Sequence, residues 1–345
     1  MSSTASESPA SFPECPFPRE SNGSILTTNV KKKKPYGNTL REQLEASSRD
    51  RLYSFFLDFG GIRGALVHAT RMVNEMRANH ELGTLETLLL GHAYIAASLM
   101  TVNLKGGDRV GIRVDCSGPA RGLSVEANAF GEVRGYLMEN PIPLDHRPES
   151  YQLRELMDQG ILSITRFLEK AKQPFTGQVE LQHGTLAEDL AHYYLVSEQT
   201  PSAFSFSIQF GPNAEVTGAG GLFLQIMPGT EETKVATLER ILRQMPPVGR
   251  LFAEQLPAEQ LLAEQFRDLS PILLGKRRVA FMCHCSKSRF RRFMAALPPE
   301  ELADILENGP FPVVTTCFNC NSAYDFPRTE IEEILTEQGE SQFSA

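Results

Sequence analysis

The chain has 345 residues, of which 41% are hydrophobic and 22% charged, and its formal net charge is -8. These values predict a globular protein of two or three domains and disfavour a general nucleic-acid binder. No run of about eighteen apolar residues occurs, which excludes an obvious membrane span, and the N-terminal MSSTASESPASFPEC lacks the apolar core of a secretory signal, so we expect a cytoplasmic protein.

The N-terminal segment, residues 1–45, is rich in Ser, Pro, Thr and Asn. Such a composition cannot bury enough apolar surface to fold alone, and we interpret the segment as a disordered tail. Its lysine run, Lys31 to Lys34, is interpreted as solvated charge rather than as a binding site.

Residues 46–229 predict an α+β core domain. We expect an edge strand soon after Asp50, a turn at Gly60, Gly61 and Gly64, and a helix over Leu66 to Met76. A buried helix is predicted for residues 85–104, and Thr185 is predicted to cap another helix. The expected strands are RVGIRVDC, GLSVEANAF, VRGYLME, GILSITRFL, TGQVELQ, FSFSIQF and LFLQIMP, the last two separated by a turn at residues 218–221.

Residues 230–275 lack strand signals and are broken by four prolines, Pro246, Pro247, Pro257 and Pro271. Apolar residues at helical spacing between charges predict several short amphipathic helices. Helices this short are marginal in water alone, so their apolar faces must pack on the preceding domain. We interpret this segment as a helical linker.

The last quarter of the chain contains four of the six cysteines, arranged as the pairs Cys283–Cys285 and Cys317–Cys320. Clustered cysteines in a reducing compartment indicate metal binding or redox chemistry, whereas the isolated Cys15 and Cys116 are interpreted as ordinary thiols. Two short-spaced pairs on separate loops can converge on one ion, and four sulfur ligands favour zinc. Residues 276–335 are therefore expected to form a small zinc module, with helices over 287–296 and 299–308 and a tail at 336–345.

Several functions remain compatible with four clustered cysteines. The site can be purely structural, or belong to a zinc ribbon that binds nucleic acid through Arg289, Arg291 and Arg292. Alternatively it senses oxidants, because metal-bound thiolates are nucleophilic and loss of the metal would unfold so small a module. A thiol-disulfide oxidoreductase is disfavoured because no thioredoxin-like unit surrounds the second pair. His284 is not expected to be a ligand, since adjacent side chains point apart.

The sequence resembles the redox-regulated heat-shock protein 33 chaperone family over about residues 50–335. The cysteine pattern carries the resemblance, together with the stretches FGGIRGALV, SLMTVNLKGGDRVGIRVDCSGPARGLSVEA, FGEVRGYL, GTLAEDLAHYYLVSEQTP and AGGLFLQIMP. Asn321 stands where the family often has Gly, and Asn tolerates the left-handed conformation that a knuckle turn needs.

The resemblance implies an ATP-independent holdase rather than an enzyme. In this family the reduced protein holds one zinc ion and is inactive, and oxidation forms the disulfides Cys283–Cys285 and Cys317–Cys320, which releases zinc and loosens the linker. The expected partners are unfolded or oxidatively damaged client proteins and a second copy of the chain in the active form. Neither a GxxxxGK[ST] nor a GxSxG motif occurs, in agreement with a non-enzymatic role.

Overall fold

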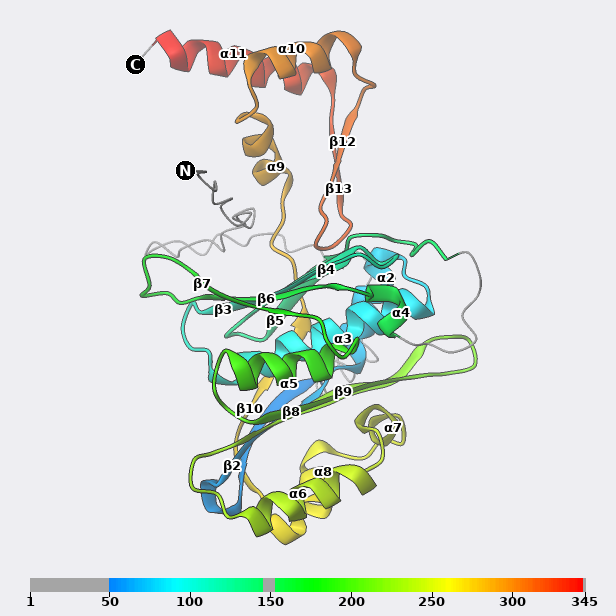
Figure 1. Ribbon diagram of the computed structural model, residues 1–345. Helices are drawn as coiled ribbons and strands as arrows, with labels where there is room; N and C mark the ends of the chain where they lie inside the picture. The colour runs from blue at the N-terminus through cyan, green and yellow to red at the C-terminus, as the bar shows by residue number, and fades with distance from the viewer. Residues whose placement is uncertain (1–49, 145–152, 344–345) are drawn as a thin grey trace, which may run out of the picture.

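A computed structural model describes residues 50–144 and 153–343 of the chain (Figure 1). The predicted tail, with Cys15 and the lysine run, lies outside the described residues. Two sheets with helices between them form the core, more helices cover the outer face of one sheet, and a C-terminal module stands beyond the other. The predicted α+β class is confirmed.

The first sheet is antiparallel and has the strand order β10-β1-β2-β9-β8. Its strands are β1 (Arg51–Leu57), β2 (Ile62–His68), β8 (Ser202–Phe210), β9 (Val216–Ile226) and β10 (Ile272–Arg278). The expectation of an edge strand after Asp50 is wrong, because β10 returns from the linker and pairs with β1.

The second sheet has the order β11-β5-β4-β3-β6-β7, antiparallel except for the parallel pair of β11 with β5. Its strands are β3 (Arg109–Cys116), β4 (Gly122–Asn128), β5 (Glu132–Leu137), β6 (Gly160–Phe167), β7 (Phe175–Glu180) and β11 (Ala280–Phe281). The predicted strands β3 to β7 are confirmed. The two-residue strand β11 was not foreseen, and it is the one that leads to the first cysteine pair.

Helix α3 (Thr84–Met100) lies between the two sheets and contacts strands of both, as the apolar sequence predicts (Figure 1). By length and composition its segment could cross a membrane, but 83% of the apolar window is buried inside the protein, which makes it a core helix. The other core helices are α2 (Thr70–His80), α4 (Leu153–Met157) and α5 (Leu186–Val196). Thr185 caps α5 by accepting a hydrogen bond from the Glu188 amide, as predicted.

Two expectations about glycines are wrong. Gly64 lies within β2 rather than in a turn, where a Cβ atom would meet the Phe55 ring at 2.2 Å, and the following helix begins only at Thr70. The expected turn at residues 218–221 lies inside β9. A Cβ on Gly218 would lie 2.0 Å from the Gly249 carbonyl oxygen, so these glycines serve the close packing of a helix on the sheet.

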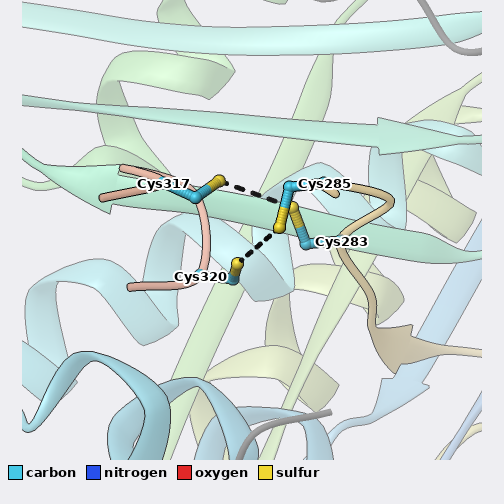
Figure 2. A group of neighbouring side chains, drawn as sticks. All are labelled: Cys283, Cys285, Cys317 and Cys320. Atoms are coloured by element: carbon cyan, nitrogen blue, oxygen red, sulfur yellow. Dashed lines mark hydrogen bonds between the residues drawn. The ribbon is translucent and has the colours of Figure 1, made fainter. Parts of the chain in front are cut away.

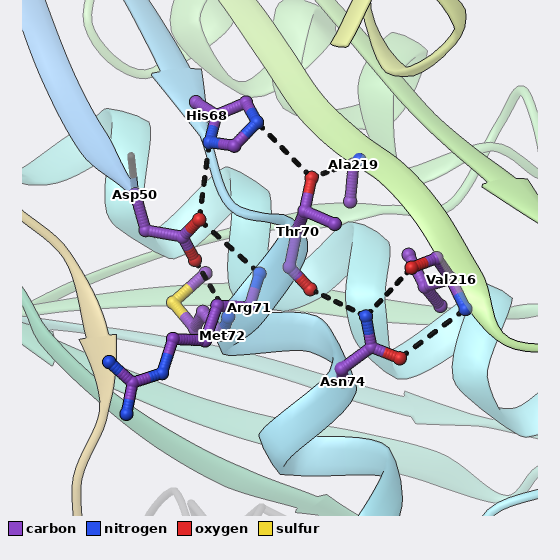
Figure 3. A network of polar contacts seen from close by, with 8 residues as sticks. All are labelled: Asp50, His68, Thr70, Arg71, Met72, Asn74, Val216 and Ala219. Atoms are coloured by element: carbon purple, nitrogen blue, oxygen red, sulfur yellow. Dashed lines mark hydrogen bonds and ion pairs between the residues drawn. The ribbon is translucent and has the colours of Figure 1, made fainter. Parts of the chain in front are cut away.

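Helix α2 is fixed to its surroundings by a buried polar network (Figure 3). The Asp50 carboxylate accepts hydrogen bonds from the backbone amides of Arg71 and Met72, at 3.3 and 2.7 Å, and thereby caps the helix from outside it. Asn74 donates to the Val216 carbonyl oxygen at 2.8 Å and links the helix to β9. These contacts fix the first two turns of α2 against β9 and the start of β1.

The outer face of the first sheet is covered by the linker helices α6 (Glu232–Gln244), α7 (Val248–Ala253) and α8 (Ala258–Gln265) (Figure 1). The predicted short helices are confirmed, with Pro247 and Pro257 immediately before two of them. Strand β10 is the part of this segment that the prediction missed. A second apolar cluster joins linker and sheet, and its linker side consists of Leu238, Ile241, Val248, Leu251, Phe252, Ala258, Leu261, Leu262, Phe266 and Leu269.

The C-terminal module contains α9 (Lys287–Met294), α10 (Pro299–Asn308), α11 (Arg328–Phe343) and the hairpin of β12 (Val313–Thr316) with β13 (Ala323–Phe326). Helices α9 and α10 match the prediction, whereas the expected tail from residue 336 belongs to α11 as far as Phe343. The module's own core is small, with Met294, Leu302, Phe326, Ile331 and Ile334 as its buried members.

Candidate metal centre

The first cysteine pair follows directly from the edge of the second sheet. The chain leaves β10 at Arg278 and enters β11 at Ala280, whose amide donates to the Gly131 carbonyl oxygen at 2.9 Å. Gly131 has φ +82°, and a Cβ there would lie 2.1 Å from the Arg278 carbonyl oxygen, so the crossing needs glycine. Cys283 and Cys285 come next, and the Ser286 hydroxyl caps α9 by accepting from the Arg289 amide.

The second pair lies at the turn between β12 and β13. The Cys317 carbonyl oxygen accepts hydrogen bonds from the amides of Cys320 and Asn321, at 3.2 and 2.7 Å. Asn321 has φ +54°, the left-handed conformation expected for its position. This local turn points both sulfurs of the pair toward the first loop (Figure 2).

The four sulfur atoms converge, and all lie within 4.8 Å of one another (Figure 2). The Sγ atoms of Cys283 and Cys317 are 3.8 Å apart, and those of Cys285 and Cys320 are 3.3 Å apart. A tetrahedral zinc ion with sulfur bonds of about 2.3 Å would separate its ligands by roughly 3.8 Å. The donor set and spacing therefore fit a zinc ion, and the four cysteines are able to bind a metal as a group.

The environment of the four sulfurs is uneven. Cys283, Cys317 and Cys320 are buried, whereas Cys285 is partly exposed. Hydrogen bonding with Cys283 is the main cause that lowers the pKa of Cys285 to about 7. Hydrogen bonding between Cys283 and Cys320 likewise lowers the pKa of Cys320. The pKa of Cys283 is raised by hydrogen bonding with Cys285. The pKa of Cys317 is raised by hydrogen bonding with Cys283. Four thiols in such close contact cannot all be deprotonated without a cation among them, because like charges at this distance repel.

Three contacts tie the cysteine loops to the core domain, and sequence reasoning missed all of them. The His80 Nε2 atom lies 3.3 Å from the carbonyl oxygen of Asn319, inside the second pair. The ring of Phe318 lies 5.5 Å from that of Tyr136 on β5. No spacing rule connects these residues, because the contacts arise only when the module packs against the second sheet.

The third contact explains the place of His284. Its Nε2 atom lies 2.9 Å from Glu132 Oε2 on β5, and this hydrogen bond lowers the pKa of the Glu132 carboxyl group. The imidazole is thus engaged with the core domain, and the group of clustered sulfurs does not include it. The prediction that His284 is not a ligand agrees with this arrangement.

Of the three arginines that favoured nucleic-acid binding, Arg292 is exposed, whereas Arg289 and Arg291 are engaged within the module. Arg291 forms a bidentate pair with Glu337, at 2.7 and 3.0 Å, and Lys287 lies 2.5 Å from Glu330. Arg289 is buried, with only 9% of its surface exposed. A phosphate backbone would have to compete with these carboxylates, so the arrangement disfavours the nucleic-acid interpretation.

The fold and site define a two-sheet α+β protein with a small four-cysteine module docked on one sheet. A sequence model described as "Hsp33 protein" matches residues 50–327. The 33 kDa chaperonin of Desulforamulus reducens is 36% identical over 80% of this chain and 94% of its own length, and that of Levilactobacillus brevis is 33% identical over 84% and 98%.

A solved structure agrees with the sequence comparisons. The crystal structure of the 33 kDa chaperonin (heat shock protein 33 homolog) of Thermotoga maritima aligns with a TM-score of 0.77 at 30% identity. The alignment covers 85% of this chain and 99% of that one. The chain belongs to the Hsp33 family, a family of chaperones rather than enzymes.

Proposed function

We propose that the protein is an oxidation-activated, ATP-independent holdase of the cytoplasm, which protects unfolding and oxidatively damaged proteins from aggregation. In this proposal the reduced protein holds one zinc ion through Cys283, Cys285, Cys317 and Cys320 and is inactive. The active form is a homodimer. The observation that carries the proposal is the convergence of four sulfurs at the joint between the core and a module with a very small core of its own.

The energetics of the C-terminal module support this switch. Its buried apolar residues are few, and a domain of this size commonly needs a metal or disulfides to remain folded. A bound zinc ion would keep the four cysteines deprotonated and join the two loops. Because metal binding free energy is then folding free energy, loss of the thiolate ligands removes most of what holds the module together.

The proposed oxidation forms one disulfide within each pair, Cys283–Cys285 and Cys317–Cys320. Two thiolates lose two electrons for each bridge, and one hydrogen peroxide takes up these electrons with two protons to give two water molecules. Bridges within each loop leave the loops free to separate, whereas bridges between the loops would fasten them together. The pairing within loops is therefore the one compatible with unfolding.

The chain offers a short route from the cysteines to the linker. Cys283 follows β11, β11 follows β10, and β10 follows the linker helices. The linker helices have 13 residues or fewer, so they depend on packing against the first sheet. We propose that unfolding of the module withdraws β11 and then β10, and that the released apolar faces of linker and sheet bind clients.

The test compares reduced and oxidised protein as suppressors of the aggregation of a thermally unfolding client enzyme, followed by light scattering. The proposal expects suppression only after oxidation, and its loss when the oxidised protein is reduced again with zinc present. A variant with Cys317→Ser and Cys320→Ser lacks two of the proposed zinc ligands and should suppress aggregation equally with and without oxidant, which separates the loss of zinc from oxidation itself. Equal behaviour of reduced and oxidised protein would overturn the proposal.

A further inference from the structure

His68 stands at the centre of a polar network that joins three parts of the fold (Figure 3). It is the last residue of β2, and 12% of its side-chain surface is exposed. One side of its ring faces the segment that leads to the first cysteine pair, and another side faces the linker helix α7. Along the chain, α8 and β10 separate α7 from that segment, so the histidine provides a second and more direct connection.

The first side of the network contacts the β10–β11 junction, residues 278–280. The Val279 amide at this junction donates a hydrogen bond to the Asp50 carbonyl oxygen at 3.2 Å. The Asp50 carboxylate lies 3.1 Å from His68 Nδ1 and also caps α2. Asp50 is only 2% exposed, so its carboxylate depends on these buried partners. A shift of the junction therefore reaches His68 through a single residue.

The second side of the network contacts α7 and the strand beneath it. The Phe252 ring of α7 packs edge-on against the His68 ring, with the ring centroids 4.3 Å apart. His68 Nε2 lies 3.3 Å from the Thr70 hydroxyl oxygen, which accepts a hydrogen bond from the Ala219 amide of β9 at 2.9 Å. A Cβ atom on the next residue, Gly220, would lie 2.5 Å from the Phe252 ring. Helix α7 thus rests on His68 and on the part of β9 to which Thr70 binds.

Hydrogen-bond chemistry gives each group in this network one role. A carboxylate can only accept, so the proton of the neutral imidazole lies on Nδ1, which faces Asp50. The Thr70 oxygen accepts from the Ala219 amide, and the Thr70 hydroxyl can donate its own hydrogen to Nε2. Rotation of the ring away from Phe252 would break both polar contacts at once. The ring therefore has one docked arrangement, as a residue that couples two segments requires.

We propose that His68 is a positioning residue that couples the docking of α7 to the docking of the β10–β11 junction. The proposal rests on the proposed function for its biological meaning, since release of these segments would expose the faces that bind clients. A coupling free energy is reciprocal, so loosening of either segment loosens the other and no order of release is required. The linker then opens as one unit rather than element by element along the chain.

The size of the coupling follows from the contacts that it uses. One net hydrogen bond corresponds to about 5- to 10-fold in an equilibrium constant. Couplings between two sites of a protein commonly amount to about 5- to 150-fold. The link through His68 uses a few contacts on each side, so we expect a coupling of about 5- to 10-fold.

The experiment is a double-mutant cycle on the full-length reduced protein, read by hydrogen exchange of the α7 and β11 amides. Gly131→Ala perturbs the junction, because a Cβ atom at this positive-φ glycine would lie 2.1 Å from the Arg278 carbonyl oxygen. His68→Phe keeps an aromatic ring against Phe252 but removes both polar contacts. Exchange is measured in the unmodified protein, in each single variant and in the double variant.

Gly131→Ala should accelerate exchange of the β11 amides whichever residue stands at position 68. In the protein that retains His68, it should also accelerate exchange of the α7 amides by about 5- to 10-fold. In the presence of His68→Phe, the acceleration of α7 exchange should fall below about 2-fold. A merely structural histidine would give the same acceleration of α7 exchange in both cases, because independent effects add.

Two control variants belong to the same cycle. His92→Phe removes a histidine that also lies beside an aromatic ring, Phe206 at 5.9 Å, but whose Nε2 has no hydrogen-bond partner among the described residues. It should leave the response of α7 to Gly131→Ala unchanged. Gly275→Ala lies on β10, where a Cβ atom would meet its nearest neighbour at 3.6 Å, and it should leave α7 exchange unchanged.

A second set of variants keeps the test decisive if His68→Phe or Gly131→Ala folds poorly. Thr70→Val removes the hydroxyl that joins His68 to β9, whereas Thr70→Ser keeps it, so only the valine variant should lose the response of α7. Glu132→Gln weakens the contact between β5 and His284 and serves as a milder perturbation of the same segment.

An equal response of α7 with and without His68→Phe, or with and without Thr70→Val, would overturn the inference. So would faster exchange of β11 without any response of α7 in the protein that retains His68, since nothing is then coupled. These measurements involve neither oxidant nor client. If the protein never suppresses aggregation after oxidation, the proposed function fails while the coupling through His68 stands.

Discussion

Leu261 on α8 offers a direct test of whether the linker restrains the holdase activity. Its side chain is fully buried in the cluster that joins the linker to the first sheet. Replacing a leucine at such a site with alanine costs about 2–5 kcal/mol, through lost burial and the cavity that remains. A loss of about 3 kcal/mol would raise the population of the undocked linker roughly 150-fold.

We therefore expect reduced, zinc-bound Leu261→Ala protein to suppress client aggregation without oxidation. Hydrogen exchange of the α6–α8 amides should accelerate in the same protein, which shows that the linker has opened. Leu162→Ala serves as the matched control, because Leu162 is equally buried but lies on β6 in the second sheet. If Leu261→Ala opens the linker and the reduced protein still does not hold clients, the linker is not the restraint that we propose.

Three further predictions concern other parts of the protein. Burial lowers the pKa of His80 and of His92 from 6.5 to about 4. Between these pH values the unfolded chain binds more protons than the folded one, so the free energy of unfolding should decrease as the pH is lowered from about 6.5 to 4. Each histidine lowers the free energy of unfolding by about 2 kcal/mol at about pH 5 relative to neutral pH, and in urea titrations a His92→Gln variant should lose less of its unfolding free energy between about pH 7 and pH 5 than the unmodified protein. Glu132→Gln should weaken the docking of the C-terminal module on the core by about 1 kcal/mol, which would appear as faster hydrogen exchange of the β11 amides, and unchanged exchange would contradict a docking role. Peptide mapping of oxidised protein should recover disulfides within each cysteine pair. Disulfides between the two cysteine loops would refute the proposed separation of these loops.

The sequence predicted the elements whose signals are local. Strands with clear alternation, the apolar helix α3, the Thr185 cap and the helices that flank the cysteines all stand close to where they were expected. The spacing of the four cysteines was enough to predict their convergence, because thiol pairs with short spacing have few other uses in a reduced protein.

The errors arose where long-range pairing overrides local pattern. Strand β10 follows proline-broken helices, and only its pairing with β1, more than two hundred residues earlier, makes it a strand. The glycines of β9 suggested a turn, yet they lie within a strand because helix α7 approaches them closely. Local sequence contains neither partner, so neither outcome could be read from it.

Around the candidate metal centre, too, local sequence predicted some residues and long-range packing determined others. The four cysteines follow from spacing, but His80 and Glu132 come from distant core elements and reach the cysteine loops only after the module has packed. Tyr324 left a weak local signal, since it lies on the strand directly after the second pair. Its hydroxyl lies 3.1 Å from the Cys285 sulfur on the other loop, a contact that only the three-dimensional structure shows.

The central claim, that loss of zinc from the cysteine site activates the protein, is tested most directly by one experiment. Zinc release from reduced protein is followed with a chelating dye during oxidant treatment, while client aggregation is measured on the same samples. Release of one zinc ion per chain that coincides with the gain of holding activity is the predicted result. Holding activity with zinc retained, or complete release without holding activity, would contradict the account and return the four cysteines to a structural role.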